Sequence, residues 1–191
     1  AFTELGGGYL MGKAFDDRAG CTVLVEAFER LCETDVNLIA VGTVQEEVGL
    51  RGAQTSAFDI NPDIGIALDV TIANDLPGSQ EHEHVTKLGE GTAIKIMDSS
   101  CISDYKLVEF LRKLAEELKI KYQMEILPRG GTDSGAMQRA RSGIPVATIS
   151  VPTRYVHTTV EMSHWGDIDG SVKLLAAFLE RAHEGEFGYE E

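Results

Sequence analysis

Two hydrophobic patterns alternate along the chain. Short apolar runs rich in β-branched residues are typical of buried strands, whereas apolar residues spaced three and four apart are typical of amphipathic helices. The first pattern predicts strands over residues 36–44, 64–70, 91–97, 122–127 and 145–151. The second predicts helices over residues 18–33, 51–58, 103–119, 133–142 and 168–183. Ser103 is the expected N-cap of the clearest of these helices.

Strands that alternate with helices predict an α/β fold whose sheet is covered on both faces. We expect a three-layer α/β/α arrangement with a mostly parallel, mixed central sheet, built by residues 1–191 as a single domain. Ligands of such sheets gather at the carboxyl ends of the strands. Residues at those ends are therefore the first candidates for a functional site.

Acidic residues and one histidine occupy these positions, either after a predicted strand or directly before the first predicted helix. The candidates are Asp16, Asp17, Glu46, Glu47, Asp69 and His157. Taken singly, each has an ordinary explanation. An aspartate pair before a helix is a common N-cap, a carboxylate in an apolar strand can form a structural salt bridge, and two adjacent glutamates can form a solvated turn.

Taken together, these residues predict a metal site. Several carboxylates that converge on one edge of a sheet repel one another strongly without a cation. Oxygen and imidazole ligands suit zinc, cobalt or manganese. Glu46 and Glu47 are neighbours, and neighbours on an extended chain point to opposite faces. We therefore expect one glutamate to bind metal while the other takes a proton from water that the metal activates.

The composition excludes several classes of partner. A formal net charge of −14 opposes binding to nucleic acid or anionic membranes, since both require clustered Lys and Arg. No apolar run approaches the roughly 20 residues that span a bilayer, and no secretory signal is evident. Three widely spaced cysteines without a CxxC pair favour a reducing cytoplasm. The helical pattern around Cys21 and Cys32 predicts buried thiols.

Two further stretches carry weaker signals. GGTDSGA, residues 130–136, precedes a predicted helix whose N-terminus could receive an anion. HEH, residues 82–84, has the residue types of a metal clip, but its acidic neighbours favour an exposed loop. The chain contains neither a GxSxG nor a GxxxxGK[ST] motif, so the sequence offers no established nucleophile elbow or phosphate loop.

Five stretches together resemble one family: AFDDRAGC, VGTVQEEVGLRGAQTSAF, IGIALDVT, LPRGGTDSGA and SVPTRYVHTTVE. They appear in the family's order and spread from about residue 14 to residue 161. The chain resembles the cytosolic TET-type metallo-aminopeptidases, some of whose members were once labelled cellulase or endoglucanase. The resemblance implies a dinuclear zinc-exopeptidase-like fold, two divalent ions, with zinc or cobalt favoured, and short peptide substrates.

The resemblance also implies a role for each candidate ligand. Asp16 matches the carboxylate that bridges the two ions, and Asp17 matches the aspartate beside it, which supports the site. Glu47 and His157 match ligands of one ion, and Asp69 matches a ligand of the other.

Glu46 matches the family's general base. In the implied mechanism it removes a proton from water activated by the two ions, and hydroxide attacks the first peptide carbonyl. Glu46 could then pass this proton to the leaving amine. Free acidic side chains or a metal near the site would hold the substrate's α-amino group, which makes the enzyme an exopeptidase.

The sequence departs from the family in one respect. The family has a further histidine ligand in an N-terminal segment, and an inserted dimerisation domain before the AFDDR stretch. Neither matches any part of these 191 residues, so we expect the chain to be the C-terminal portion of the catalytic domain. For the intact protein the resemblance implies dimers that build a dodecamer.

Two alternatives to an aminopeptidase are open. The missing histidine motivates a catalytically silent chain that acts as a metal-binding or assembly piece. A glycoside hydrolase with paired carboxylates is disfavoured, because adjacent glutamates cannot readily flank a glycosidic bond and the chain has one Trp for a sugar platform.

Overall fold

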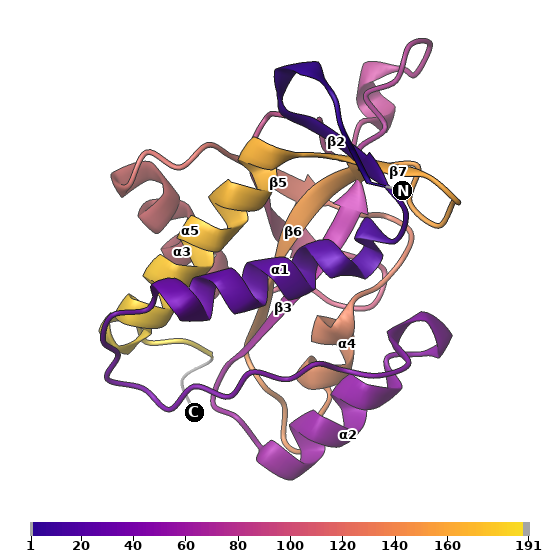
Figure 1. The fold of residues 1–191 in the computed structure, drawn as a ribbon. Coiled ribbons are helices and arrows are strands. Elements are labelled where there is room, and N and C mark those ends of the chain that lie inside the picture. The colour runs from indigo at the N-terminus through magenta and orange to yellow at the C-terminus, as the bar shows by residue number, and fades with distance from the viewer. Residues whose placement is uncertain (1, 189–191) are drawn as a thin grey trace.

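A mixed sheet forms the centre of the molecule (Figure 1). The computed structural model describes residues 2–188. Its strands are β1 (Thr3–Glu4), β2 (Tyr9–Gly12), β3 (Gly65–Ile72), β4 (Thr92–Met97), β5 (Tyr122–Ile126), β6 (Val146–Arg154) and β7 (Glu161–His164). Its α-helices are α1 (Phe15–Arg30), α2 (Arg51–Ile60), α3 (Tyr105–Glu117), α4 (Asp133–Gln138) and α5 (Trp165–Arg181).

The strands follow the order β1-β2-β7-β6-β4-β5, and β3 pairs with β6. Among the described residues two strand pairs are parallel, β3 with β6 and β4 with β5, and the other four are antiparallel. The long strand β6 belongs to the first parallel pair and joins it to the second through its antiparallel pairing with β4. Its position places the carboxyl end of β3 beside the loop that joins β6 to β7.

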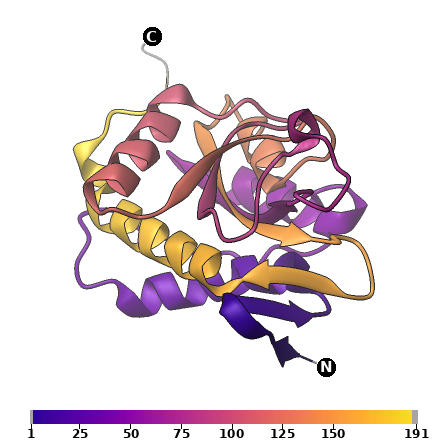
Figure 2. The same ribbon diagram turned by 90° about the horizontal axis from the view of Figure 1, so that it is seen from above.

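Helices cover both faces of this sheet (Figures 1 and 2). α1, α3 and α5 pack on one face, where the main core includes Val23, Ile94, Leu107, Ile149 and Val172. α2 and α4 pack against each other, and α4 contacts β3 and β6 on the opposite face. The expected three-layer α/β/α architecture with a mixed sheet is confirmed.

Most predicted elements are present with shifted boundaries. The predicted helices correspond in order to α1 through α5, and the strands predicted over 64–70, 91–97, 122–127 and 145–151 correspond to β3, β4, β5 and β6. The N-cap of α3 is Asp104, whose carboxylate accepts a hydrogen bond from the Leu107 N–H at 2.9 Å. The prediction of Ser103 was wrong because its hydroxyl donates to the Lys95 carbonyl.

The strand predicted over residues 36–44 was wrong. These residues form a long connection in which Ile39, Val41 and Val44 are 62%, 38% and 66% exposed. A strand exists only when a neighbour accepts and donates its backbone hydrogen bonds. No strand within residues 2–188 pairs with this segment, so its apolar and β-branched composition does not produce one.

Three short strands were absent from the predicted elements. β1 and β2 form a hairpin in the Gly-rich opening, and β2 then pairs with β7. Strands of two to four residues are too short to show a clear alternation.

None of the helices in the described part of the chain is long and apolar enough to cross a membrane.

Candidate metal centre

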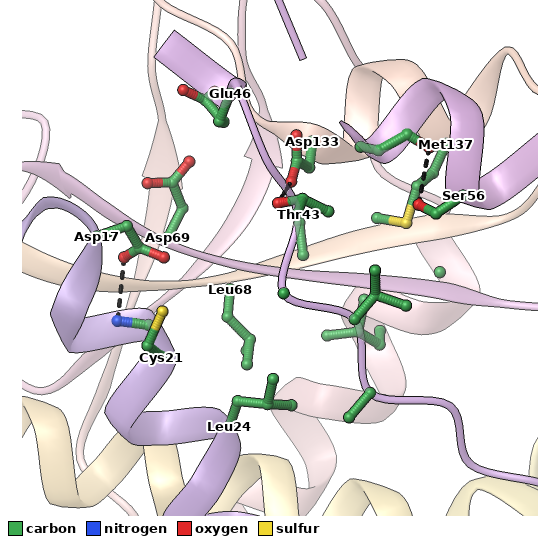
Figure 3. Close-up of a pocket in the computed structure, with 18 of the residues that line it drawn as sticks. Asp17, Cys21, Leu24, Thr43, Glu46, Ser56, Leu68, Asp69, Asp133 and Met137 are labelled. Carbon is green, nitrogen blue, oxygen red and sulfur yellow. Dashed lines mark hydrogen bonds between the residues drawn. The ribbon is translucent and has the colours of Figure 1, made fainter. Parts of the chain in front are cut away.

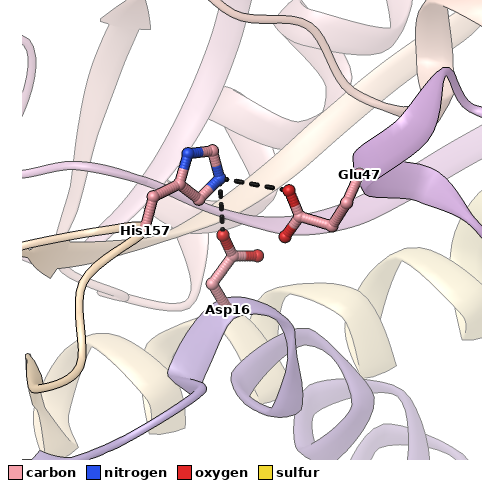
Figure 4. A group of neighbouring side chains, drawn as sticks. All are labelled: Asp16, Glu47 and His157. Carbon is pink, nitrogen blue, oxygen red and sulfur yellow. Dashed lines mark ion pairs between the residues drawn. The ribbon is translucent and has the colours of Figure 1, made fainter.

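Asp16, Glu47 and His157 converge from three separate elements (Figure 4). Asp16 lies in the first turn of α1, Glu47 on a single 3-10 turn (Glu46–Val48), and His157 in the loop between β6 and β7. The His157 Nε2 atom lies 3.1 Å from Asp16 Oδ2 and 3.3 Å from Glu47 Oε2. The structure thus brings together the three residues that the resemblance assigns to one ion.

A second group of carboxylates shares Asp16. Ligand atoms of Asp16, Asp17 and Asp69 all lie within 4.8 Å of one another. The peptide bond between Asp16 and Asp17 is cis. Asp17 Oδ1 accepts a hydrogen bond from the Gly20 N–H at 3.0 Å, which fixes this carboxylate against the helix. Asp69 reaches the group from near the carboxyl end of β3.

Glu46 and Glu47 separate for a different reason from the one expected. They lie on a 3-10 turn, after Gln45 in a left-handed conformation, and not at the end of a strand. Successive side chains on such a turn diverge by roughly 120°. Glu47 therefore reaches His157, and both glutamates line the adjacent cavity, where Glu46 lies with Asp17 and Asp69 (Figure 3).

Glu161 ties two of the candidate ligands together, and the sequence did not single it out. Its carboxylate accepts hydrogen bonds from the N–H of Asp16 at 3.0 Å and from the N–H of His157 at 3.3 Å. The side chain is only 2% exposed. The one signal in the sequence is that a glutamate at the start of β7 follows the histidine by four residues.

Burial and mutual repulsion raise the pKa values of the clustered carboxyls. Burial and the negative charge of Glu47 raise the pKa of Asp16 to about 6. Burial, together with its acidic neighbours, raises the pKa of Asp17 to about 8. The same causes raise the pKa of Glu46 to about 7 and that of Asp69 well above its ordinary value. The cluster is thus short of positive charge.

The donor set fits a divalent cation. Two donors on one tetrahedral zinc ion lie roughly 3.3 Å apart, given bonds of about 2.0–2.1 Å to nitrogen and oxygen. The separations of 3.1 and 3.3 Å from His157 Nε2 to the two carboxylates match this spacing. A cation would also relieve the repulsion that raises the carboxyl pKa values. Asp16, Glu47 and His157 could hold one ion, and Asp16 with Asp69 a second.

The weaker motifs contribute differently. Asp133, the first residue of α4, accepts a hydrogen bond from the Thr43 hydroxyl at 2.6 Å and lines the cavity beside Glu46 (Figure 3). Its carboxylate makes this helix start unsuited to an anion. His84 Nε2 lies 2.9 Å from the Ser79 hydroxyl, and no group of candidate ligands in the described residues includes the HEH stretch.

Comparison with known proteins identifies relatives of the chain. A family model described as M42 glutamyl aminopeptidase matches residues 1–174. The glutamyl aminopeptidase of Lactococcus lactis subsp. cremoris is 39% identical over 89% of this chain and 47% of its own length. The lysyl aminopeptidase of Pyrococcus furiosus is 36% identical over 97% of this chain and 53% of its own length.

Solved structures agree with the sequence relatives. The aminopeptidase APDkam598 of Desulfurococcus kamchatkensis is similar at a TM-score of 0.92 and 43% identity, over 94% of this chain and 51% of that one. The dodecamer-forming PhTET1 is similar at 0.78 and 34% identity, over 93% of this chain and 53% of that one. The chain spans about half the length of these relatives. The TET-type resemblance is confirmed, and the chain belongs to the M42 glutamyl aminopeptidase family.

Proposed function

We propose that the chain carries the metal centre of an aminopeptidase that removes N-terminal residues from peptides. The observation that carries this proposal is the convergence of Asp16, Glu47 and His157 at the rim of a cavity that Glu46 and Asp69 also line. The family, whose relatives are named aminopeptidases, supports the same reaction class. Two divalent ions, zinc or cobalt, are the proposed cofactors.

Divalent ions at these ligands would supply the Lewis acidity that lets water lose a proton near neutral pH. Glu46 is the proposed acceptor of that proton, because it faces the cavity and is not a member of either ligand group. Its pKa of about 7 suits a group that takes up a proton and then delivers it to the leaving amine. Asp17 is proposed to hold Asp16 and Asp69 in place from the buried side.

The acidic end of the cavity supports a substrate with a free α-ammonium group. Asp17, Glu46, Asp69 and Asp133 all line this cavity, and carboxylates attract an ammonium in a partly desolvated site. Recognition of a free amino terminus is what limits a peptidase to removing the terminal residue.

A paired substitution tests the assignment of roles. Glu46→Gln should abolish release of aniline from aminoacyl-anilides while the zinc or cobalt content stays near that of the unmodified protein. Glu47→Gln should lower the metal content itself. Glu29→Gln, an exposed change on α1, is the control for the loss of one negative charge. Equal metal content in the Glu46 and Glu47 variants would refute the division of roles.

A silent chain is the competing proposal, in which residues 1–191 bind metal or assemble without turnover. Turnover by the 191-residue chain alone, at a rate comparable with a full-length relative, would reject it. Metal binding without turnover would favour it, and the activity would then belong to a longer polypeptide, with this chain as the C-terminal portion of its catalytic domain.

We further propose self-association into dimers and a dodecamer, since PhTET1 is described as a dodecamer. The proposed compartment is the cytoplasm, with peptides as partners rather than nucleic acid or membranes. Light scattering at several protein concentrations would test the assembly.

A further inference from the structure

Lys95 and Glu125 lie on the same face of the central sheet as Asp69. Asp69 of β3 is paired with Ser150 of β6, which is paired in turn with Ala93 of β4. Paired residues direct their side chains to one face of a sheet, and so do residues two apart along a strand. Lys95 follows Ala93 by two residues, and its own partner on β5 is Glu125. A lysine and a glutamate therefore share the face from which Asp69 reaches the candidate metal centre.

The charges of this lysine and glutamate are buried. Lys95 Nζ lies 3.0 Å from Glu125 Oε1 and 3.7 Å from Asp98 Oδ2, and the three side chains are 1%, 0% and 0% exposed. Lys95 is the only buried lysine or arginine within residues 2–188. Its ammonium makes no well-aligned hydrogen bond in that range, so the two carboxylates alone balance its charge.

Polar contacts connect the pair to β3. The Thr71 hydroxyl donates a hydrogen bond of 2.6 Å to Glu125 Oε1, the same oxygen that Lys95 Nζ approaches. Thr71 follows Asp69 by two residues, so the two side chains are neighbours on one face of β3. Burial and acidic neighbours raise the pKa of Asp69, and the positive charge of Lys95 opposes them. The ammonium thus lies close enough to act on Asp69.

The position of the pair has an electrostatic consequence for the metal centre. Charges interact more strongly inside a protein than in water, because the effective dielectric constant is lower there. The charge of Lys95 would therefore repel a divalent ion held by Asp69, and the charge of Glu125 would attract it. Water screens Glu47 and His157, which are 58% and 69% exposed, so the ion at those ligands is less affected.

We propose that Glu125 sets the affinity of the ion that Asp16 and Asp69 would hold, by offsetting the positive charge of Lys95. Neither member of the buried pair touches that ion. Both are positioning residues, which act on the ion through the field around Asp69. This inference rests on the proposed pair of metal sites, and it distinguishes the two sites by the charges that lie beneath one of them.

Glu125→Gln tests the proposal. Glutamine has nearly the same shape and still accepts from the Thr71 hydroxyl, but it leaves the charge of Lys95 without its nearest partner. Isothermal titration of the 191-residue chain with Zn²⁺ should show an affinity for the second ion about tenfold lower than in the unmodified chain. The affinity for the first ion should change little. Circular dichroism monitors the folding of each variant.

The double variant Lys95→Met/Glu125→Gln separates an effect of charge from an effect of packing. Lys95, Glu125 and Asp98 together have a net charge of −1 when all three are ionised. Glu125→Gln makes this net charge zero, and the second substitution restores it to −1. The affinity for the second ion should therefore return to near that of the unmodified chain, although two buried contacts are lost. Lys113→Met, an exposed change on α3, is the control and should alter neither affinity.

Three results would overturn the proposal. The first is an unchanged affinity for the second ion in Glu125→Gln. The second is a double variant that binds this ion no more tightly than Glu125→Gln does, because packing alone would then explain the loss. The third is an unmodified chain that binds no second ion, which would also refute the proposed pair of metal sites. The first two results refute only the role of the buried pair.

Discussion

The carboxylate of Glu161 accepts a hydrogen bond from the backbone N–H of Asp16 at 3.0 Å, across 145 residues of sequence. The same carboxylate accepts from the N–H of His157 at 3.3 Å. One buried side chain at the start of β7 thereby holds the backbones of two candidate ligands that come from α1 and from the β6–β7 loop. Glu161 is not within either ligand group itself.

Glu161→Gln should weaken divalent-ion binding. A glutamine amide has one carbonyl oxygen, so it can accept only one of the two N–H bonds and presents an N–H₂ group to the other. Loss of such supporting contacts costs about 10- to 100-fold in metal affinity in other sites. Isothermal titration with Zn²⁺ measures the effect, and Glu29→Gln on the exposed face of α1 is the control. Unchanged affinity in Glu161→Gln would show that the contact does not orient the ligands.

The metal-free protein should lose stability as the pH rises from about 5 to 8. The pKa values of Asp16, Glu46 and Asp17 are raised to about 6, 7 and 8, above the roughly 4 of carboxyls in an unfolded chain. The folded state therefore binds more protons in this range. The stabilisation that these three carboxyls contribute is fully present below about pH 4, and it is lost as the pH rises through their pKa values in the folded state.

Thermal unfolding in EDTA across this pH range measures the trend. Saturating Zn²⁺ should reverse the loss at pH 8, because a bound cation offsets the repulsion between carboxylates that protonation removes at lower pH. Asp17→Asn should flatten the pH dependence, since it removes the carboxyl whose pKa of about 8 lies at the upper end of this range. A melting temperature that increases steadily from pH 5 to 8 without metal would contradict the prediction.

Arg154→Met should destabilise the protein by about 1–2 kcal/mol at pH 7, since hydrogen bonds to charged partners contribute on this scale. Arg154 Nε and Nη2 donate to the two oxygens of Asp75 at 2.8 and 2.9 Å, and the two side chains are only 19% and 15% exposed. Burial raises the pKa of Asp75, but the hydrogen bonds and positive charge of Arg154, together with the hydrogen bond from the Leu88 N–H, outweigh burial and lower the pKa.

The matched control is Arg112→Met on α3, where the arginine pairs with Glu109 and Glu116 at the surface. Surface pairs contribute little, so this change should alter the free energy of unfolding by less than about 0.5 kcal/mol. Urea titration compares the two variants. Equal losses would mean that burial of the Asp75–Arg154 pair has no influence on its contribution.

Lys95→Met should destabilise the protein by about 3–5 kcal/mol, because it leaves the buried carboxylates of Glu125 and Asp98 without a cation. Lys95 Nζ lies 3.0 Å from Glu125 Oε1, and the two side chains are 1% and 0% exposed. The double variant Lys95→Met/Glu125→Gln should recover part of the loss, since glutamine is neutral and still accepts from the Thr71 hydroxyl, while Asp98 still lacks its cation. Additive losses in this double-mutant cycle would contradict a coupled pair.

The linear sequence alone was sufficient for the helices and the longer strands. The stripe of Leu107, Leu111 and Leu114 predicted α3 because a repeat of three to four residues places side chains on one face of a helix. The run IGIALDVT predicted β3 because a strand that is covered on both faces has a nearly continuous apolar sequence, and residues 65–71 of β3 are buried or half-buried. Such patterns lie within the segment itself, so they predict a helix or a strand without knowledge of the rest of the fold.

The candidate ligands were also recognisable before any geometry. Asp16, Glu47, Asp69 and His157 stand where acidic or imidazole side chains end or follow predicted strands or begin a helix, and five stretches of the sequence associate them with one family. The split between Glu46 and Glu47 was anticipated on incorrect grounds. A 3-10 turn, rather than an extended strand, separates the two side chains.

Three features were decided only by the tertiary structure. Glu161 meets Asp16 across 145 residues, and no local pattern encodes a contact at that separation. Cys21 and Cys32, which the helical pattern predicted to be buried, are both exposed, and Cys21 lines the cavity that Glu46 and Asp69 also line. Residues 36–44 have the composition of a strand but no paired neighbour, and β structure needs hydrogen bonds from a second segment whereas a helix satisfies its own backbone. The sequence by itself determined whether each segment could form a helix or a strand, and hydrogen bonding between distant segments decided which of the possible strands formed.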